Sequence, residues 1–428
     1  MLNQKEVFQT FIGRKAALYG LGTETEKALR ELGDKFDIIG LLDSFKESGE
    51  LYGKKILSVR QAVDMGVSLI IVVARPGSCK AIAKRMKETC LQNQIRLFDV
   101  RGKDLLVANK AAYDFRHLSG ITRAELIREA MKAEIISFDL FDTLVTRAAL
   151  SYTDIFDLME YQIRKRGWKI PDFSGRRLSA EKELAKTGAP TLKEIYENVL
   201  RELKESSDDL LRELTDKESL DTLSEELADM EWKLDFSMIV PRTEVCDVLN
   251  HIAQSGKTVY IVTDTYYKKE QIIKILQKYG VNGYKDIIAS CEYHTGKRQK
   301  LFGRFREMCR GMECLHIGDD LAADIEAASG YGMKSIRLYS SVDLFDELGS
   351  LGLDSCVESL ADRVKVGSFI ARLFNSPFQF EHIDRMVGIR GAYNVGYLLC
   401  APIICDFLLW FYENVKRRGI RNIWFSAR

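Results

Sequence analysis

The sequence predicts an α/β protein: a Rossmann-like parallel sheet, then a doubly wound parallel core with a helical cap insertion, then a helical carboxyl region. Three observations predict it. Apolar runs alternate with helical stretches over residues 15–100, the alternation returns at residue 135, and a long charged helical stretch interrupts it over about residues 148–239. Hydrophobic residues make up 46% of the 428 positions, which suffices for several buried cores.

The first unit is expected over residues 1–103 as a Rossmann-like domain. A helix should run from the Gly20-Leu21-Gly22 turn to residue 32. Consecutive strands joined by helical crossovers run parallel, so a parallel sheet follows. The strands are expected at residues 15–19, 36–42, 69–74 and 95–98.

A helical linker over residues 104–133 precedes the second unit, which is expected over residues 134–340. The insert of about residues 148–239 falls between the first two strands of this unit. Its charged helical faces predict a cap above the carboxyl edge of the sheet. The strands are expected at residues 135–139, 258–262 and 314–317, with weaker signals at 287–289 and 335–338.

Residues 341–428 are expected to be mostly helical, with a new strand at residues 422–425. A strand so near the last residue suggests a truncated chain. The apolar run over residues 395–412 contains Pro402 and Asp406. Because a charge at mid-span is costly in a bilayer, a buried helix of a soluble domain is the favoured interpretation and no membrane span is expected.

Composition narrows the classes of partner. Lys plus Arg is 63 and Asp plus Glu is 62, so the net charge is +1 and no nucleic-acid partner is expected. The nine cysteines show no metal-ligand or disulfide spacing, which favours reduced thiols in the cytoplasm. The amino end does not resemble a signal peptide.

Polar residues that could perform chemistry follow several expected strands. Asp139 ends the strand at 135–139, and Thr263 follows the strand at 258–262. Asp319 and Asp324 follow the strand at 314–317, and Lys297 lies in a Thr-Gly-Lys-Arg loop before it. Because the carboxyl ends of parallel strands meet at one edge, these groups should converge there. Any one of them alone could be a turn or helix cap.

In this order, the four features resemble the four motifs of the haloacid dehalogenase-like (HAD) hydrolase superfamily. The resemblance implies that Asp139 is the nucleophile and that Thr143 supports its turn. It implies that Thr263 donates to a phosphate oxygen. The third-motif lysine would be Lys297, with Lys300 as the second choice.

The fourth motif of the family, Gly-Asp-x-x-x-x-Asp, is matched by Gly318, Asp319 and Asp324. The resemblance implies a Mg²⁺ ion and an aspartyl-phosphate intermediate. The ion would be held by Asp139, Asp319, Asp324 and the backbone carbonyl of Phe141.

The match covers about residues 134–340 and has one departure. The second Asp of the first motif, which is the acid/base of the family's phosphatases, is replaced by Phe141, and Asp142 comes one position later. Phe cannot transfer a proton, so turnover should fall by about 10²–10⁴-fold unless another group substitutes. Asp142 and Arg147 are expected substrate contacts, because both follow the nucleophile closely.

The amino-terminal domain carries its own motif. Gly20-Leu21-Gly22 resembles a dinucleotide fingerprint with Thr25 in place of the third Gly, and Asp43 follows about twenty residues later. The segment is similar to Rossmann-like domains attached to sugar acyltransferases and other glycan-assembly enzymes. A nucleotide or nucleotide sugar bound by Gly20, Gly22 and Asp43 is one interpretation, and a structural or docking domain is the other.

The expected function is hydrolysis of a small phosphorylated metabolite, a sugar phosphate or nucleotide sugar. The whole arrangement resembles HAD hydrolases found among surface-polysaccharide enzymes. Two alternatives stay open: an impaired binding or scaffold protein in polysaccharide assembly, and a C–halogen or C–P cleaving enzyme. In the cap, Arg177 and Glu181 are interpreted as a solvated helix ion pair, and Trp168, Tyr196 and Trp232 as core.

Overall fold

The computed structural model describes residues 11–74, 76–100, 102–106, 120–168, 170–206, 220–347, 353, 357–378 and 391–424. It divides into two compact units. The first comprises Met1–His117 with Asp346–Asp354, and the second comprises Leu118–Phe345 with Ser355–Arg428. Each unit is described by itself below.

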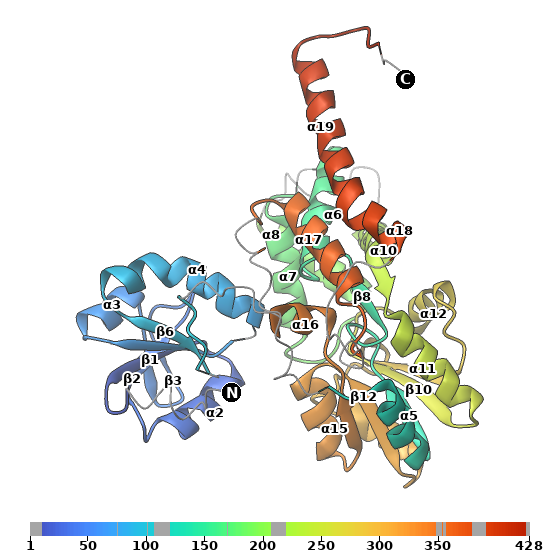
Figure 1. Ribbon diagram of the computed structural model, residues 1–428, viewed down its shortest axis with the longest axis horizontal. Helices are drawn as coiled ribbons and strands as arrows, with labels where there is room; N and C mark the ends of the chain where they lie inside the picture. Colours follow the sequence, from blue (N-terminus) through green and yellow to red (C-terminus); the bar gives the residue numbers. More distant parts are fainter. Residues whose placement is uncertain are drawn as a thin grey trace. The chain divides into compact units, whose positions relative to one another are not determined.

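The first unit is a six-stranded sheet with the order β3-β4-β2-β1-β5-β6, in which only β3 runs antiparallel to its neighbour. Its central strands are almost wholly buried, as the continuous apolar runs predict for a parallel sheet covered on both faces. Helix α2 covers one face, and α4 covers the other (Figure 1). The elements are β1 (Lys15–Tyr19), α2 (Thr23–Leu32), β2 (Asp37–Leu42), β3 (Glu50–Leu51), β4 (Lys54–Leu57), α3 (Val59–Asp64), β5 (Leu69–Val72), α4 (Pro76–Gln92) and β6 (Arg96–Asp99).

The second unit has a five-stranded, fully parallel sheet with the order β11-β10-β7-β12-β13. The first strand in the chain, β7, lies at the centre, and the chain extends outward from it first on one side and then on the other. The strands are β7 (Ile135–Phe138), β10 (Thr258–Thr263), β11 (Tyr284–Ala289), β12 (Cys314–Gly318) and β13 (Lys334–Arg337).

Helices cover both faces of this sheet. Side chains of α5, α11 and α12 form the core on one face, and those of α14 and α15 form the core on the other. This doubly wound arrangement confirms the predicted fold class. The helices are α5 (Arg123–Lys132), α11 (Thr243–Gln254), α12 (Lys269–Lys278), α13 (Ser290–Tyr293), α14 (Leu301–Cys309), η1 (Leu321–Glu326) and α15 (Ala327–Gly330).

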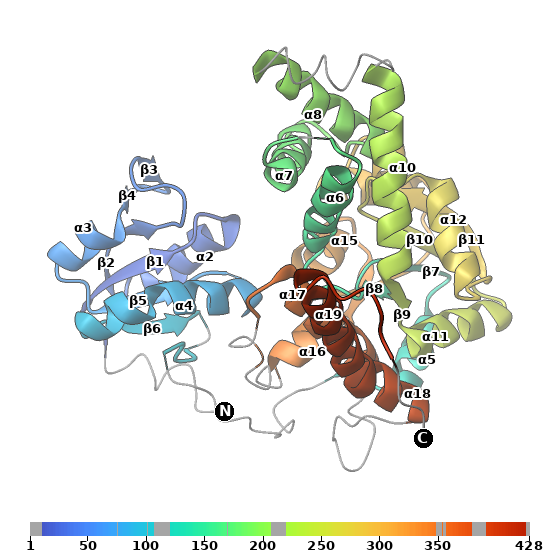
Figure 2. The same cartoon turned by 90° about the horizontal axis from the view of Figure 1, so that it is seen from above.

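The insert between β7 and β10 folds as a group of helices reached through a two-stranded antiparallel ribbon. The ribbon strands β8 (Val145–Arg147) and β9 (Ile239–Pro241) are the entry and exit of the insert. Figure 2 shows the helices gathered at one end of the sheet. They are α6 (Asp154–Lys165), α7 (Phe173–Leu184), α8 (Leu192–Ser206) and α10 (Leu220–Met238).

A buried ion pair, not a solvated one, lies inside this cap. Arg177 is fully buried and donates to both carboxylate oxygens of Glu231 at 2.8 Å, and to Glu181 at 2.8 Å. The hydroxyl of Tyr196 also donates to Glu231. The solvated-pair interpretation was therefore wrong, because helical spacing shows that Glu181 is near but not that α10 supplies a second carboxylate. The core positions of Tyr196 and Trp232 are confirmed.

The carboxyl region is helical, but it differs from the sequence prediction in two respects. The apolar run was predicted to be buried, yet only 6% of the most apolar window of Ala392–Arg417 is buried, so that prediction was wrong. This helical stretch projects from the unit in Figure 1, and by length and composition it is the one candidate membrane span among the described residues. The elements are α16 (Ser341–Glu347), α17 (Leu360–Leu373), α18 (Ala392–Val395), η4 (Gly396–Cys400) and α19 (Ala401–Arg417).

The second departure concerns the strand expected at residues 422–425. Residues 422–424 have no strand conformation in the structure, and residue 425 lies outside the described residues. Their apolar pattern suits a strand, but a strand requires a partner edge, and no described strand pairs with them.

Replacing Arg177 with Ala tests the cap core. We expect the free energy of unfolding to fall by about 3–5 kcal/mol, because Glu231 would keep a buried charge without its partner. The exposed pair of Lys186 and Glu183 provides a control, since Lys186→Ala should change stability by less than about 0.5 kcal/mol. Urea unfolding followed by tryptophan fluorescence measures both, and equal effects of the two substitutions would contradict the prediction.

Candidate active site

The site lies where the strand order reverses. Strands β7 and β12 are neighbours in the sheet, and the connections that follow them lead to opposite sides. Open α/β sheets bind their ligands outside the carboxyl ends of the strands at such a point. The Asp139 amide donates to the carbonyl of Ile317 at 2.9 Å, so both strands end at the same level. Asp139 and Asp319 therefore leave the sheet side by side.

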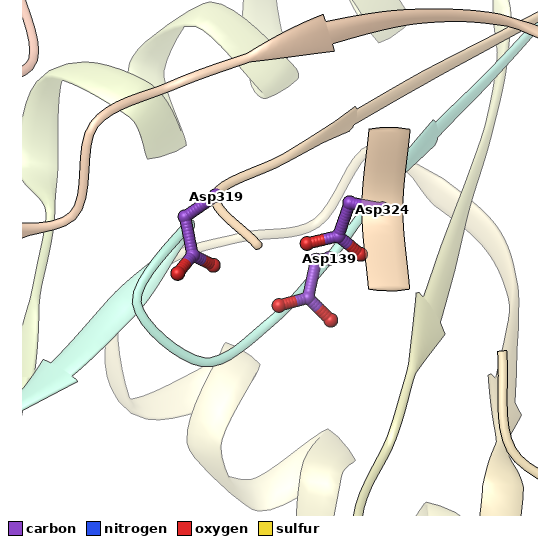
Figure 3. Close-up of side chains that lie close together, drawn as sticks. All are labelled: Asp139, Asp319 and Asp324. Carbon is purple, nitrogen blue, oxygen red and sulfur yellow. The ribbon is translucent and has the colours of Figure 1, made fainter. Parts of the chain in front are cut away.

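Three carboxylates lie close together at this point, as Figure 3 shows. One oxygen each from Asp139, Asp319 and Asp324 lies within 4.8 Å of the other two. Asp139 and Asp324 are buried, at 6% and 1% exposure. Thr143 donates to Asp319 at 3.1 Å and holds that side chain in place. The fold thus brings these three carboxylates together.

Lys297 is the cation of the cluster. Its Nζ lies 2.5 Å from Asp139 Oδ1 and 2.5 Å from Asp324 Oδ1, and it is 2% exposed. The backbone amide of Lys297 donates to Asp264 Oδ1 at 2.9 Å, which anchors the loop that carries it. Lys300, the second choice for this role, begins α14 as its N-cap.

Burial and charge act against each other in this cluster. Burial raises the pKa of Asp139 to about 7, although Lys297 opposes the shift. Burial and the neighbouring Asp142 and Asp139 raise the pKa of Asp319 well above its usual range. Lys297 and His316 outweigh the burial of Asp324 and hold its pKa below the usual range, while the two carboxylates raise the pKa of Lys297.

A buried hydroxyl lies at the end of β10, the strand that pairs with β7. Thr263, the last residue of β10, is fully buried, and its Oγ1 has no hydrogen-bond partner. A buried polar atom without a partner costs about 1–3 kcal/mol, so such an atom is a strong indication of a missing ligand. It fits a donor to a bound oxyanion.

Comparison with known proteins adds an independent observation. The family model of haloacid dehalogenase-like hydrolases matches residues 133–332. These residues are a haloacid dehalogenase-like hydrolase domain. The name hydrolase domain is used for residues 133–332. A search of curated proteins finds no match to the chain.

Solved structures resemble the same part of the chain. The HAD-hydrolase YfnB from Bacillus subtilis, bound to magnesium, has 19% identity and a TM-score of 0.34, covering 48% of this chain and 88% of that one. A HAD phosphatase from Thermococcus onnurineus has 19% identity and a TM-score of 0.31, covering 48% and 86%. A haloacid dehalogenase-like hydrolase from Xanthomonas campestris has 14% identity and a TM-score of 0.34, covering 49% and 82%. At identities and TM-scores this low, the activities of those proteins are not assigned to this chain.

Asp324 is held firmly within the hydrolase domain. Its Oδ1 accepts from Lys297 and lies 3.1 Å from His316 Nε2, and its Oδ2 accepts from the Asp320 amide at 2.9 Å. A Cβ on Gly318 would lie 2.3 Å from Asp324 Cγ, so glycine is required there. These contacts make Asp324 the anchor of Lys297, and its direct binding of a metal stays a prediction.

Sequence reasoning missed two polar residues inside the sheet. His316 and Ser137 are partners in the register of β12 and β7, and His316 Nδ1 lies 2.8 Å from Ser137 Oγ. Burial lowers the pKa of His316, although Asp324 opposes the shift. The signal that sequence reasoning could have used is one polar residue inside each of two otherwise apolar strands.

Sequence reasoning also missed Arg242, which is fully buried beside the site. Its guanidinium donates to the backbone carbonyls of Asp142, Tyr339 and Asn375. Asp142 has φ of 58°, a left-handed conformation that the carbonyl contact secures. Arg242 therefore fixes the turn after the nucleophile.

Two predicted substrate contacts have other partners. Arg147 donates to both oxygens of Asp235 at 2.8 Å, and its guanidinium lies 4.2 Å from the centre of the Phe141 ring. Asp142 accepts from Thr146 Oγ1 at 2.9 Å. The structure thus argues against a direct role of Arg147 in substrate binding, because helix α10 supplies a carboxylate that the local sequence does not show. Gly20, Gly22 and Asp43 belong to the first unit.

The donor set fits Mg²⁺. When all three carboxylates are ionised, they and the one ammonium group carry a net charge of about −2, which a divalent cation would neutralise. Ligands on opposite sides of Mg²⁺ are roughly 4 Å apart, so the oxygens within 4.8 Å need only a small side-chain rotation. Asp139 and Asp319 are the residues that would hold the ion; the contribution of the Phe141 carbonyl stays a prediction.

Mg²⁺ should stabilise the hydrolase domain against heat. At a concentration of 100 times Kd the gain is about 2.7 kcal/mol, and it should be larger at pH 8 than at pH 6, because protons compete for a carboxyl whose pKa is raised to about 7. Asp319→Asn should abolish the shift, whereas Asp229→Asn, an exposed carboxylate in the cap, should retain it. Thermal unfolding with and without Mg²⁺ measures this, and an unchanged shift in Asp319→Asn would contradict it.

Proposed function

We propose that the hydrolase domain is a Mg²⁺-dependent phosphatase of a small phosphorylated metabolite, such as a sugar phosphate or nucleotide sugar. The supporting observations are the buried Asp139 carboxylate, held by Lys297 at the strand switch point with Asp319 beside it, and the partnerless Thr263 hydroxyl at the end of the adjacent strand β10. A carboxylate, an ammonium group and a free donor are the parts that phosphoryl transfer through an aspartyl intermediate requires.

Each residue has one task in the proposed reaction. An Asp139 oxygen attacks phosphorus, the bond from phosphorus to the ester oxygen breaks, and the departing oxygen takes up a proton from solvent water. Thr263 donates to a phosphate oxygen, and Lys297 opposes the repulsion between the carboxylate and the phosphate. Bound Mg²⁺ would neutralise charge on the phosphate oxygens. Water then attacks the aspartyl-phosphate and releases phosphate and Asp139.

Phe141 limits both proton transfers. Its ring lies under Arg147 and 6.2 Å from the ring of Tyr267, so it is part of a packed layer between core and cap. No proton donor replaces the family's acid/base at that position. This favours a second candidate function, a scaffold or binding protein of polysaccharide assembly with slow turnover. The retained Asp319 and Asp324 support a metal site, and so disfavour the C–halogen alternative.

The cytoplasm is the proposed compartment. All eight described cysteines are free thiols, and six of them are buried. Reduced thiols are the usual state in a cytoplasm. The proposed partner is the small phosphorylated substrate.

An activated aryl phosphate should reveal the intermediate. A good leaving group needs little protonation, whereas hydrolysis of the aspartyl-phosphate needs a base, so we expect a burst of about one equivalent followed by slow turnover. Stopped-flow absorbance measures the burst, and mass spectrometry should place the phosphate on Asp139. Asp139→Asn should remove both signals. No phosphorylation of the unmutated protein would favour the scaffold.

Replacing Phe141 with Asp should speed the second step. Arg147 lies beside the new carboxyl and should keep it ionised, so it can act as a base toward water. We expect steady-state turnover of the aryl phosphate to rise by about 10-fold or more, with a smaller accumulation of intermediate. Phe141→Leu is the matched control for lost packing and should not accelerate turnover. Equal rates in the two variants would mean that another group already supplies the base.

A further inference from the structure

The cap is joined to the sheet of the second unit through its two ribbon strands. Strand β8 leads into the insert and β9 leads out of it, and the two strands pair along Val145–Arg147 and Ile239–Pro241. Because an insert has only these two covalent links to its host, any motion of the cap relative to the sheet must bend the chain there. An element that packs on the ribbon therefore limits how freely the cap can move.

Helix α17 packs on the entry side of this ribbon. It follows the hydrolase domain in sequence, yet it lies against β8 (Figure 1). A Cβ on Gly367 would lie 2.1 Å from the carbonyl carbon of Ala149, so the backbone of α17 touches the backbone where the cap begins. Ala371, which is fully buried, forms a small apolar cluster with Ala148 and Val240. One helix thus contacts both sides of the hinge.

The segment after α17 holds the exit side through two reciprocal hydrogen bonds. The side-chain amide of Asn375 donates to the Pro241 carbonyl at 2.9 Å, and the guanidinium of Arg242 donates to the Asn375 carbonyl at 2.9 Å. Asn375 also donates to the Ala371 carbonyl at 2.8 Å, which fixes its amide relative to α17. Because Arg242 also secures the turn at Asp142, this contact is continuous with the active site.

A third contact joins α17 to the first helix of the cap. The guanidinium of Arg363 lies 2.8 Å from a carboxylate oxygen of Asp154 and 2.5 Å from one of Asp157, and both acids are on α6. The Asp154 side chain is fully buried, and buried pairs are screened less by salt than exposed ones. Helix α17 and Asn375 therefore hold the entry, the exit and the first helix of the cap.

We infer that α17, together with Asn375, is a brace on the hinge of the cap, and that the cap moves over the active site only when these contacts are released. A two-stranded ribbon alone is only marginally stable, so it would be a flexible link. Apolar, hydrogen-bond and ion-pair contacts to one helix make it a stiff one. For the proposed function, entry of substrate to Asp139 then depends on residues outside the hydrolase domain.

Hydrogen–deuterium exchange of the full chain measures the hinge directly. Asn375→Ala removes the bond to Pro241, and Arg363→Ala removes both ion pairs to α6. We expect either change to speed exchange of the ribbon amides, in peptides covering residues 144–149 and 238–243, by about 5-fold or more. Peptides of strand β11 should exchange as in the parent.

Matched controls come from the same region of the chain. Lys365→Ala removes an ion pair that joins α17 to Asp406 on α19 and not to the cap, so ribbon exchange should stay as in the parent. Gly367→Ala should push α17 away from Ala149 and speed ribbon exchange further, whereas Gly396→Ala should not, because its Cβ would have nothing within 4 Å. If Gly367→Ala does not fold, Asn375→Ala and Arg363→Ala decide the question.

Two exchange results would overturn the inference. One is ribbon exchange that stays unchanged in Asn375→Ala and Arg363→Ala, and the other is an equal acceleration in β11, which would mean a general loss of stability.

The role in substrate entry has a separate readout. With the activated aryl phosphate below saturation, Arg363→Ala should raise the second-order rate constant of the burst by about 2–10-fold. An unchanged burst with faster ribbon exchange would contradict the role in entry. Because exchange requires no substrate, a parent without any burst would count against the proposed function alone, and the exchange result would still decide whether α17 braces the hinge.

Discussion

The ammonium group of Lys297 is the interaction on which the active site depends. Asp139, Asp319 and Asp324 converge because two neighbouring strands end at one level, and carboxylates this close together repel one another. Lys297 contacts two of them at 2.5 Å. The remaining negative charge is what a divalent cation would balance. The sheet brings the carboxylates together, and the positive charge of Lys297 offsets part of their mutual repulsion.

Arginine side chains around the site join segments of the chain through charged hydrogen bonds. Arg242 binds three backbone carbonyls and fixes the turn after the nucleophile. Arg147 joins the cap ribbon to α10 through Asp235, and Arg177 joins α7 to α10 through Glu231. A guanidinium has several N–H donors, and each of them needs an acceptor when it is removed from water. Each of these arginines therefore joins segments that are distant in the chain. The cap is held by polar contacts as well as by its apolar core.

Phe141 connects this scaffold to the chemistry. In a position from which the family's phosphatases transfer protons, the chain has an apolar ring with the Arg147 guanidinium over its face and the Tyr267 ring tilted beside it. Attack by Asp139 does not depend on that ring, but protonation of the leaving group and activation of water do. For the proposed reaction, the site therefore has the parts needed to form an aspartyl-phosphate and lacks the usual part needed to hydrolyse it.

The sequence by itself predicted the two α/β sheets, their main helices and the convergence of Asp139, Lys297 and Asp319. These follow from local rules: apolar runs form buried strands, and parallel strands end at a common edge. Only the tertiary structure decided which partners the charged residues take. Arg147 and Arg177 find carboxylates on α10, dozens of residues away, and no spacing rule encodes such contacts. The exposure of α19 was decided in the same way, since burial depends on which surfaces meet and not on the apolar character of one helix alone.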